Sequence, residues 1–186
     1  MKIKTKVYLF TLVALVAGYL MISPVARAAS PSGEDSKEVS QYLNEAKVEA
    51  HELEQDVNTM ESFTRSDLTA QSHATTLNEI GDHINKAGKL LAKLHAARDG
   101  GSAWQQKAID EIEPLLKELA ANTKMAMEFF NDNKRHINVS PTYQEYLKSN
   151  CGLAKELSEL ITDYVDYGFH KAEFDRLGEK VVASER

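Results

Sequence analysis

The strongest constraint on the fold is an apolar spacing of three and four residues that continues through most of the chain. A step that alternates between three and four keeps apolar side chains on one face of an α-helix, and several such faces can close around a common core. The spacing predicts helices over residues 36–65, 67–98, 103–132 and 141–169. No segment shows the period-two alternation of a β-strand. The predicted fold class is therefore all-α.

The residues at this spacing are called the seam residues below. They are Val39, Leu43, Ala46, Ala50, Leu53, Val57, Met60, His73, Leu77, Ile80, Ile84, Ala87, Leu91, Leu94, Ile112, Leu116, Leu119, Thr123, Ala126, Phe130, Tyr143, Leu147, Ala154, Leu157, Ile161 and Tyr164. Asn150 is a polar exception in the last helix, and with Thr123 it is expected to fix the register of the helices.

Local signals place the helix ends and leave short links between the helices. The Asp-Gly-Gly sequence at 99–101 ends the second helix, and Ser102 with Gln105 forms a capping box that begins the third. Ser140 followed by Pro141 begins the fourth helix. Because short links join antiparallel neighbours, we predict an up-down-up-down four-helix bundle.

Two further features modify this plan. Pro114 lies in the middle of the third helix, where it removes a hydrogen bond and crowds the preceding turn, so we predict a kink there. The C-terminal residues 171–186 are expected either to extend the last helix or to form a short fifth one.

The first residues have the organisation of an export signal. Residues 1–28 contain three lysines, then an apolar stretch, then a small-residue exit in which Ala26 and Ala28 form an A-x-A site. We predict cleavage after Ala28, a flexible leader over 29–35 and a single bundle domain over 36–186. The alternative is an uncleaved membrane anchor, although the apolar stretch is short for a span. A cleaved chain is expected to be periplasmic or secreted, without a stable membrane span.

The net charge of the chain makes polyanionic partners unexpected. The chain carries 22 basic and 28 acidic residues, a net charge of −6, and loss of four basic residues with the signal would take it to −10. Such a surface repels phosphate backbones and anionic lipid headgroups, so nucleic acid is not an expected partner. The single cysteine, Cys151, allows no internal disulfide, although it is able to link two chains.

The sequence contains none of the motifs expected of an enzyme. A G-x-S-x-G elbow, a phosphate-binding loop and a dinucleotide fingerprint are all absent. His51 lacks the second histidine of an H-E-x-x-H zinc helix, and no E-x-x-H or C-x-x-C-H occurs. We therefore expect a non-enzymatic protein with no cofactor and no recognisable metal site.

One histidine leaves a cofactor alternative open. The predicted topology brings His73 to one end of the bundle together with Met60, Met127 and several aromatic residues. An imidazole and thioethers among aromatic rings are what a non-covalent b-type haem requires, and they also allow a divalent metal. The plainer interpretation is a core histidine bonded to a tyrosine hydroxyl or a backbone carbonyl, with methionines filling gaps.

The second helix has two other notable pairs. Glu79 and His83 lie four residues apart, which is typical of a surface ion pair. Gly81 and Gly88 lie seven apart, which favours the close approach of a neighbouring helix, or alternatively a groove for a flat ligand.

The sequence thus predicts a structural or partner-binding role in the cell envelope. The aromatic residues near the C-terminus, Tyr164, Tyr167, Phe169 and Phe174, are the expected contact surface, because tyrosine and phenylalanine are enriched at interface centres. The partner is expected to be another envelope protein or a second copy of the chain. The alternative for these aromatic residues is packing of the tail onto the bundle.

Two resemblances accompany this interpretation. The predicted third helix is similar to uncharacterised exported helical-bundle proteins of bacteria, and this resemblance implies no activity. It is carried by Trp104-Gln105, Ala108-Ile109, Ile112, Pro114-Leu115-Leu116, Glu118-Leu119-Ala120 and Asn122-Thr123. The plan also resembles cytochrome b562, but residues 39–46 contain no methionine, and Met60 lies at the opposite end of the bundle from His170.

Overall fold

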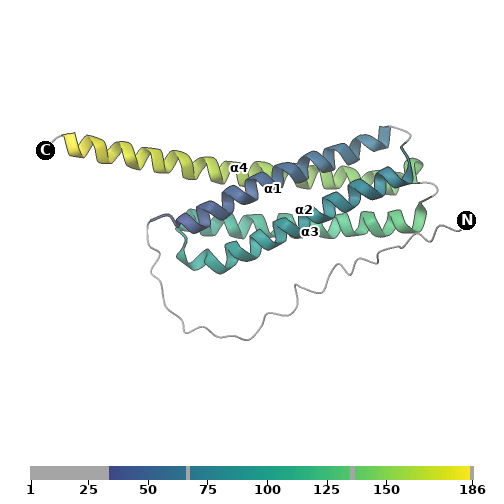
Figure 1. Cartoon of the computed structure of the whole chain (residues 1–186), viewed down its shortest axis with the longest axis horizontal. Helices are drawn as coiled ribbons and strands as arrows, with labels where there is room; N and C mark the ends of the chain where they lie inside the picture. The colour runs from purple at the N-terminus through teal and green to yellow at the C-terminus, as the bar shows by residue number, and fades with distance from the viewer. Residues whose placement is uncertain (1–33, 66–67, 135–136, 185–186) are drawn as a thin grey trace, which may run out of the picture.

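A computed structural model describes residues 34–65, 68–134 and 137–184, so the predicted signal peptide lies outside the described residues. The described chain contains four long helices and three short 3-10 turns, with no strand among the described residues (Figure 1). The helices are α1 (Lys37–Ser62), α2 (Ala70–Ala97), α3 (Ala103–Asn133) and α4 (Pro141–Ser184). The 3-10 turns are η1 (Phe63–Arg65), η2 (Arg98–Gly100) and η3 (Ile137–Val139).

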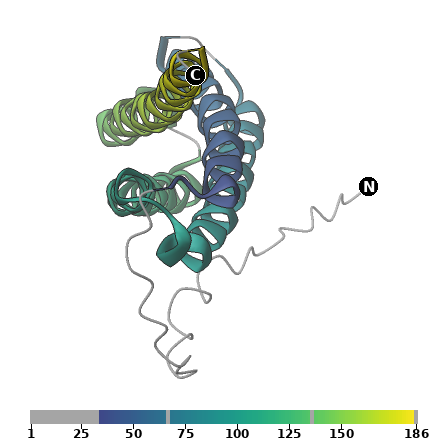
Figure 2. The same cartoon turned by 90° about the vertical axis from the view of Figure 1, so that its left-hand side faces the viewer.

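The four helices form an up-down-up-down bundle, as the sequence predicts. Extensive contacts join α1 to α2, α3 to α4 and α1 to α4, and a smaller contact joins α2 to α3. The view along the bundle shows the four helices around one core (Figure 2). Every seam residue is buried except Ala87 and Tyr164, which are partly buried. The apolar spacing therefore identified the core almost completely.

Side-chain caps explain where the helices begin. The Ser36 hydroxyl accepts a hydrogen bond from the Val39 N–H at the start of α1, and Thr69 caps α2 in the same way. The predicted capping box of Ser102 and Gln105 is present at the start of α3. These caps satisfy backbone N–H groups that have no partner within the helix.

A pair of amides lies inside the α3–α4 contact. The Asn122 side-chain amide donates to the Asn150 side-chain oxygen at 2.7 Å and to the Tyr146 carbonyl at 3.0 Å. Because a buried amide loses hydrogen bonds when helices slip, this pair favours a single register. Asn150 was recognised from the sequence as a polar exception, whereas its partner Asn122 was not.

The third and fourth helices bear differently on the two features noted above. Helix α3 continues through Pro114, which is exposed, and the kink expected there stays a prediction. Helix α4 continues to Ser184, with no break into a fifth helix among the described residues, so its 44 residues extend well beyond the other helices (Figure 1). Among the described residues, no helix combines the length and the apolar character needed to cross a membrane.

Candidate functional site

The His73 end of the bundle, where α1 and α3 end and α2 and α4 begin, is closed by aromatic rings. His73 is 1% exposed, and its ring lies 5.3 Å from Phe63, 6.4 Å from Phe130 and 5.7 Å from Tyr143, measured between centroids. Its Nδ1 atom lies 3.3 Å from the Tyr143 hydroxyl. Its Nε2 atom is buried and has no hydrogen-bond partner among the described residues. Burial lowers the pKa of His73, so the neutral imidazole is favoured.

The two methionines proposed as partners of His73 belong to the same end. Met60 is 1% exposed. Met127 is partly buried, and its methyl group lies 2.9 Å from where a Cβ atom on Gly81 would be, which is the close helix approach expected of that glycine. Haem or metal binding by Met60, His73 and Met127 stays a prediction.

A second histidine, His83, lies between α1 and α2 and faces carboxylates on α1. Its Nδ1 atom contacts Glu49 and lies 3.8 Å from Glu52, and its Nε2 atom lies 3.4 Å from Asp56. The His83 side chain is 17% exposed. The sequence suggested Glu79 as its partner because the two share a helix face, yet the described ion pairs of His83 are all with α1.

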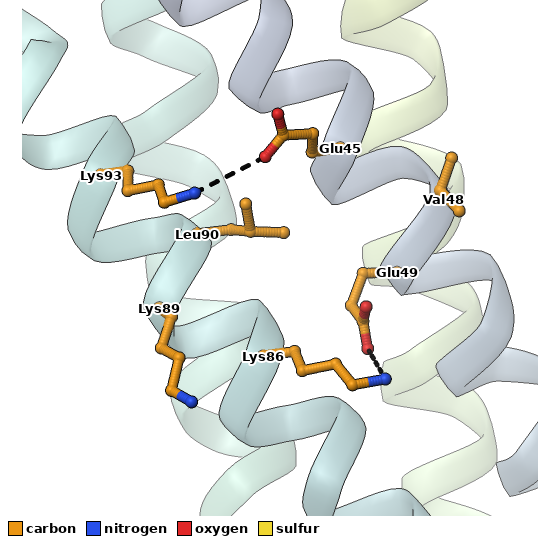
Figure 3. A pocket seen from close by; sticks show the side chains of 7 residues that line it. All are labelled: Glu45, Val48, Glu49, Lys86, Lys89, Leu90 and Lys93. Atoms are coloured by element: carbon orange, nitrogen blue, oxygen red, sulfur yellow. Dashed lines mark ion pairs between the residues drawn. The ribbon is translucent and has the colours of Figure 1, made fainter.

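A groove continues from this cluster along the same helix pair. Its lining residues come from both helices and are Glu45, Val48, Glu49, Lys86, Lys89, Leu90 and Lys93. Figure 3 shows lysines of α2 facing glutamates of α1 across it. Lys86 lies 3.7 Å from Glu49, and Lys93 lies 3.7 Å from Glu45. These ion pairs largely balance the charge, so the groove by itself defines no ligand.

The Trp104 end, where α1 and α3 begin and α2 ends, is held together by polar groups. The Gln105 side chain is fully buried, accepts from the Ser36 N–H at 2.8 Å and donates to the Ser36 carbonyl at 2.8 Å. It also donates to the Ser40 hydroxyl at 2.9 Å. One amide therefore joins the beginnings of α1 and α3. The sequence identified Gln105 only as a capping residue.

Trp104 fixes the direction in which α4 leaves the bundle. Its ring stacks on Tyr164 and meets Tyr167 edge-on, and a Cβ atom on Gly168 would lie only 2.7 Å from it. Its indole N–H donates to Asp35 at 2.6 Å. Because the glycine lets the indole pack directly against the α4 backbone, the sequence of this end determines where the rest of α4 points.

An ion pair between Lys171 and Asp35 completes the contacts between α4 and the Trp104 end. Lys171 on α4 lies 3.1 Å from Asp35. Burial acts to raise the pKa of Asp35, but hydrogen bonds from Ser102, Trp104 and Lys171 outweigh it and hold that pKa below its usual value. Burial, together with a hydrogen bond to Glu111, raises the pKa of Tyr164 to about 12.

Beyond this anchor α4 is surrounded by solvent. Residues 172–183, called the arm below, are all exposed. Tyr167 at its base and Phe174, Leu177 and Val181 along it are 53%, 78%, 48% and 58% exposed. Their positions follow the same three-and-four rhythm as the seam residues, with His170 between the first two. These four apolar residues are called the arm stripe. Residues 172–183 therefore do not pack onto the bundle, whereas Tyr164 and Tyr167 contact Trp104.

The single cysteine lies on the bundle and not on the arm. Cys151 is partly buried, and its Sγ atom lies 2.9 Å from the Asn58 side-chain oxygen. Burial first, and then the nearby charges of Glu61 and Glu54, raise the pKa of its thiol. The thiolate, which is the nucleophilic form, is therefore disfavoured.

Comparison with known proteins adds no assignment: no family model, no curated protein and no solved structure matches this chain.

Proposed function

We propose that this chain is an exported, non-enzymatic helical bundle of the cell envelope that acts by partner binding through the arm. We further propose that the partner is a second copy of the chain. The observation that carries the proposal is the arm stripe, whose residues beyond the bundle continue the apolar spacing and are largely exposed, Phe174 at 78% and Leu177 at 48%. Apolar side chains exposed in a row on one helix face are typical of association sites.

The charges of the arm favour pairing with another arm. Between residues 171 and 183 the chain carries three basic and three acidic residues, although the chain as a whole has a net charge of −6. Two arms therefore approach without the repulsion that acts between two acidic bundles. If two antiparallel arms place Phe174 beside Leu177 of the second copy, Glu173 faces Lys180 across the pair, which is the charge pattern that flanks a coiled-coil seam.

The anchor at the base of the arm supports the same proposal. Trp104 contacts Tyr164, and Lys171 pairs with Asp35, so α4 is held against the bundle just before the arm and the direction of the arm is set before any partner binds. A preorganised binding element avoids part of the entropy cost of association.

Light scattering after size-exclusion chromatography of the exported protein, over a hundredfold concentration range, tests the proposal. We expect a concentration-dependent dimer that is lost when Phe174 and Leu177 are both changed to Glu. The matched control is Met125→Glu, which places the same charge at an apolar residue that is 44% exposed on the bundle. A monomer at every concentration, or a dimer that survives in the double variant, would overturn self-association.

The export part of the proposal has its own test. N-terminal sequencing of the protein recovered from the periplasm or the medium should begin at Ala29. Recovery in the membrane fraction with residues 1–28 still attached would contradict cleavage, and it would support the anchor alternative.

A second candidate function is cofactor binding at the His73 end, favoured by the buried Nε2 atom that has no partner among the described residues. Titration of the exported protein with haemin measures it directly. A Soret band that saturates at one equivalent and disappears in His73→Leu would support this function, and an unchanged haemin spectrum would exclude haem binding.

A further inference from the structure

The cluster around His83 combines the donor types of a transition-metal site with the geometry that such a site requires. Helix α1 supplies Glu49, Glu52 and Asp56, whose spacing of three and four residues places them on one face. Helix α2 supplies the imidazole. The donor atoms of Glu49, Glu52 and His83 all lie within 4.8 Å of one another. Tetrahedral ligand bonds of about 2.0–2.2 Å to a Zn²⁺ ion place the ligand atoms roughly 3.5 Å apart. The Nδ1 atom of His83 lies 3.8 Å from the Glu52 carboxylate.

The two ring nitrogens of His83 have different partners, so the cluster separates into metal-ligand candidates on the Nδ1 side and a residue that orients the imidazole on the Nε2 side. Nδ1 faces the carboxylates of Glu49 and Glu52, whereas Nε2 faces Asp56 at 3.4 Å. A histidine that binds a metal through one nitrogen almost always donates its other N–H to a carboxylate or carbonyl. Asp56 is placed to accept that hydrogen bond and to fix the tautomer in which Nδ1 is free to bind a metal.

Burial and charge favour a cation at this position. The side chains of Glu49 and His83 are 12% and 17% exposed, so their interactions with an ion are screened less than those of surface groups. Three carboxylates meet here, and the nearest fixed positive charge is Lys86, 3.7 Å from Glu49 (Figure 3). A divalent ion bound by Glu49 would compete with this lysine.

We infer that Glu49, Glu52 and His83 bind a divalent transition-metal cation of the Zn²⁺ class, with Asp56 as a positioning residue for His83. One imidazole and two carboxylates suit Zn²⁺ and leave a fourth coordination position for water. The site lies on the body of the bundle between α1 and α2, so it is independent of the arm, and neither proposal requires the other.

Calorimetric titration of the untagged, chelator-treated protein with Zn²⁺ tests the inference. We expect one saturable equivalent, no saturable binding in His83→Ala and binding weakened by about 10–100-fold in Asp56→Asn. The matched control is His51→Ala, which removes an exposed histidine of α1 that also lies near a carboxylate, Glu54. This control should bind Zn²⁺ like the unmodified protein.

Two further variants separate a metal site from a network of ion pairs. Lys86→Met removes the competing charge and should tighten Zn²⁺ binding, a change that a purely structural network does not produce. Glu52→Gln alters a half-exposed side chain, so the bundle should fold normally while Zn²⁺ binding weakens at least tenfold. Zn²⁺ affinity equal to that of the unmodified protein in either His83→Ala or Glu52→Gln, or an absence of saturable binding in the unmodified protein, would overturn the inference.

Discussion

The two ends of the bundle are built from different chemistry although the same four helices form both. At the His73 end, rings from η1, α3 and α4 pack against one buried imidazole of α2. At the Trp104 end, one buried amide joins the starts of α1 and α3, and Lys171 of α4 pairs with Asp35. The first end is closed, and the second continues into the arm. One bundle can therefore end in a sealed apolar layer at one end and in a polar anchor for an exposed helix at the other. We place partner binding at the polar end.

The largest effect is expected from removing a ring at the closed end. Phe130 is 4% exposed, and Phe130→Ala should lower the free energy of unfolding by about 3–5 kcal/mol, because it leaves a cavity beside His73. Urea denaturation followed by circular dichroism measures the change. Phe174→Ala on the arm is the matched variant and should change monomer stability by less than about 0.5 kcal/mol. Equal losses in both variants would contradict the division into a packed end and an exposed arm.

The next effect concerns the buried amide of the Trp104 end. Gln105→Ala should lower the free energy of unfolding by about 2–3 kcal/mol, since it leaves the Ser36 backbone groups without their partner. The neighbouring Gln106 makes one backbone contact, to the Gly101 carbonyl, so Gln106→Ala should cost about 1 kcal/mol or less. The same denaturation experiment ranks the two variants, and a reversed order would show that Gln105 does not hold this end together.

A glycine substitution then tests whether Trp104 sets the direction of the arm. Gly168→Ala forces a methyl group against the indole and should cost about 1–3 kcal/mol. Because Trp104 is the only tryptophan, its fluorescence reports the displacement directly. Gly178→Ala, where an added Cβ meets nothing, should leave the fluorescence unchanged and stabilise the helix by up to about 1 kcal/mol. An unchanged emission spectrum in Gly168→Ala would contradict the anchor.

The smallest effect is a pH dependence at the closed end. Burial lowers the pKa of His73 below its ordinary value of 6.5, so the unfolded chain binds this proton more readily than the folded one. Stability should therefore be full above about pH 6.5 and fall as the pH decreases, by at most about 1.4 kcal/mol per pH unit. Denaturation at pH 7 and pH 5 measures the slope. His73→Gln should have a shallower slope, and an identical one would show that another group is responsible.

The sequence predicted the core far better than the contacts between helix surfaces. The seam spacing identified the buried faces, and the topology then brought Met60, His73 and Met127 to one end, because both depend on local periodicity and short links. The sequence was less able to predict which residues of neighbouring helices contact one another on the outer faces of the bundle. Glu79 lies on the same helix as His83, but the carboxylates of α1 contact the imidazole once the two helices pack.

The same limit applies to the Trp104 end. A capping box predicts how Gln105 contacts its own helix, but the bond to Ser36 depends on where α1 begins in space. Likewise, Gly168 has no turn or motif that marks it, and only the position of Trp104 explains it. The sequence also could not predict that the arm is exposed, since an apolar seam has the same spacing whether or not a partner helix covers it.

The length of α4 has a consequence for the timescale on which its backbone opens. Short helices without packing partners are only marginally stable in water, so amides in the arm should exchange with deuterium far faster than those of α4 within the bundle. Pairing of two arms would bury the stripe and slow this exchange. We expect protection of backbone amides from exchange to end near Lys171 at low protein concentration. As the concentration rises, this boundary should move toward the C-terminus, so each newly protected amide reports association of the arms.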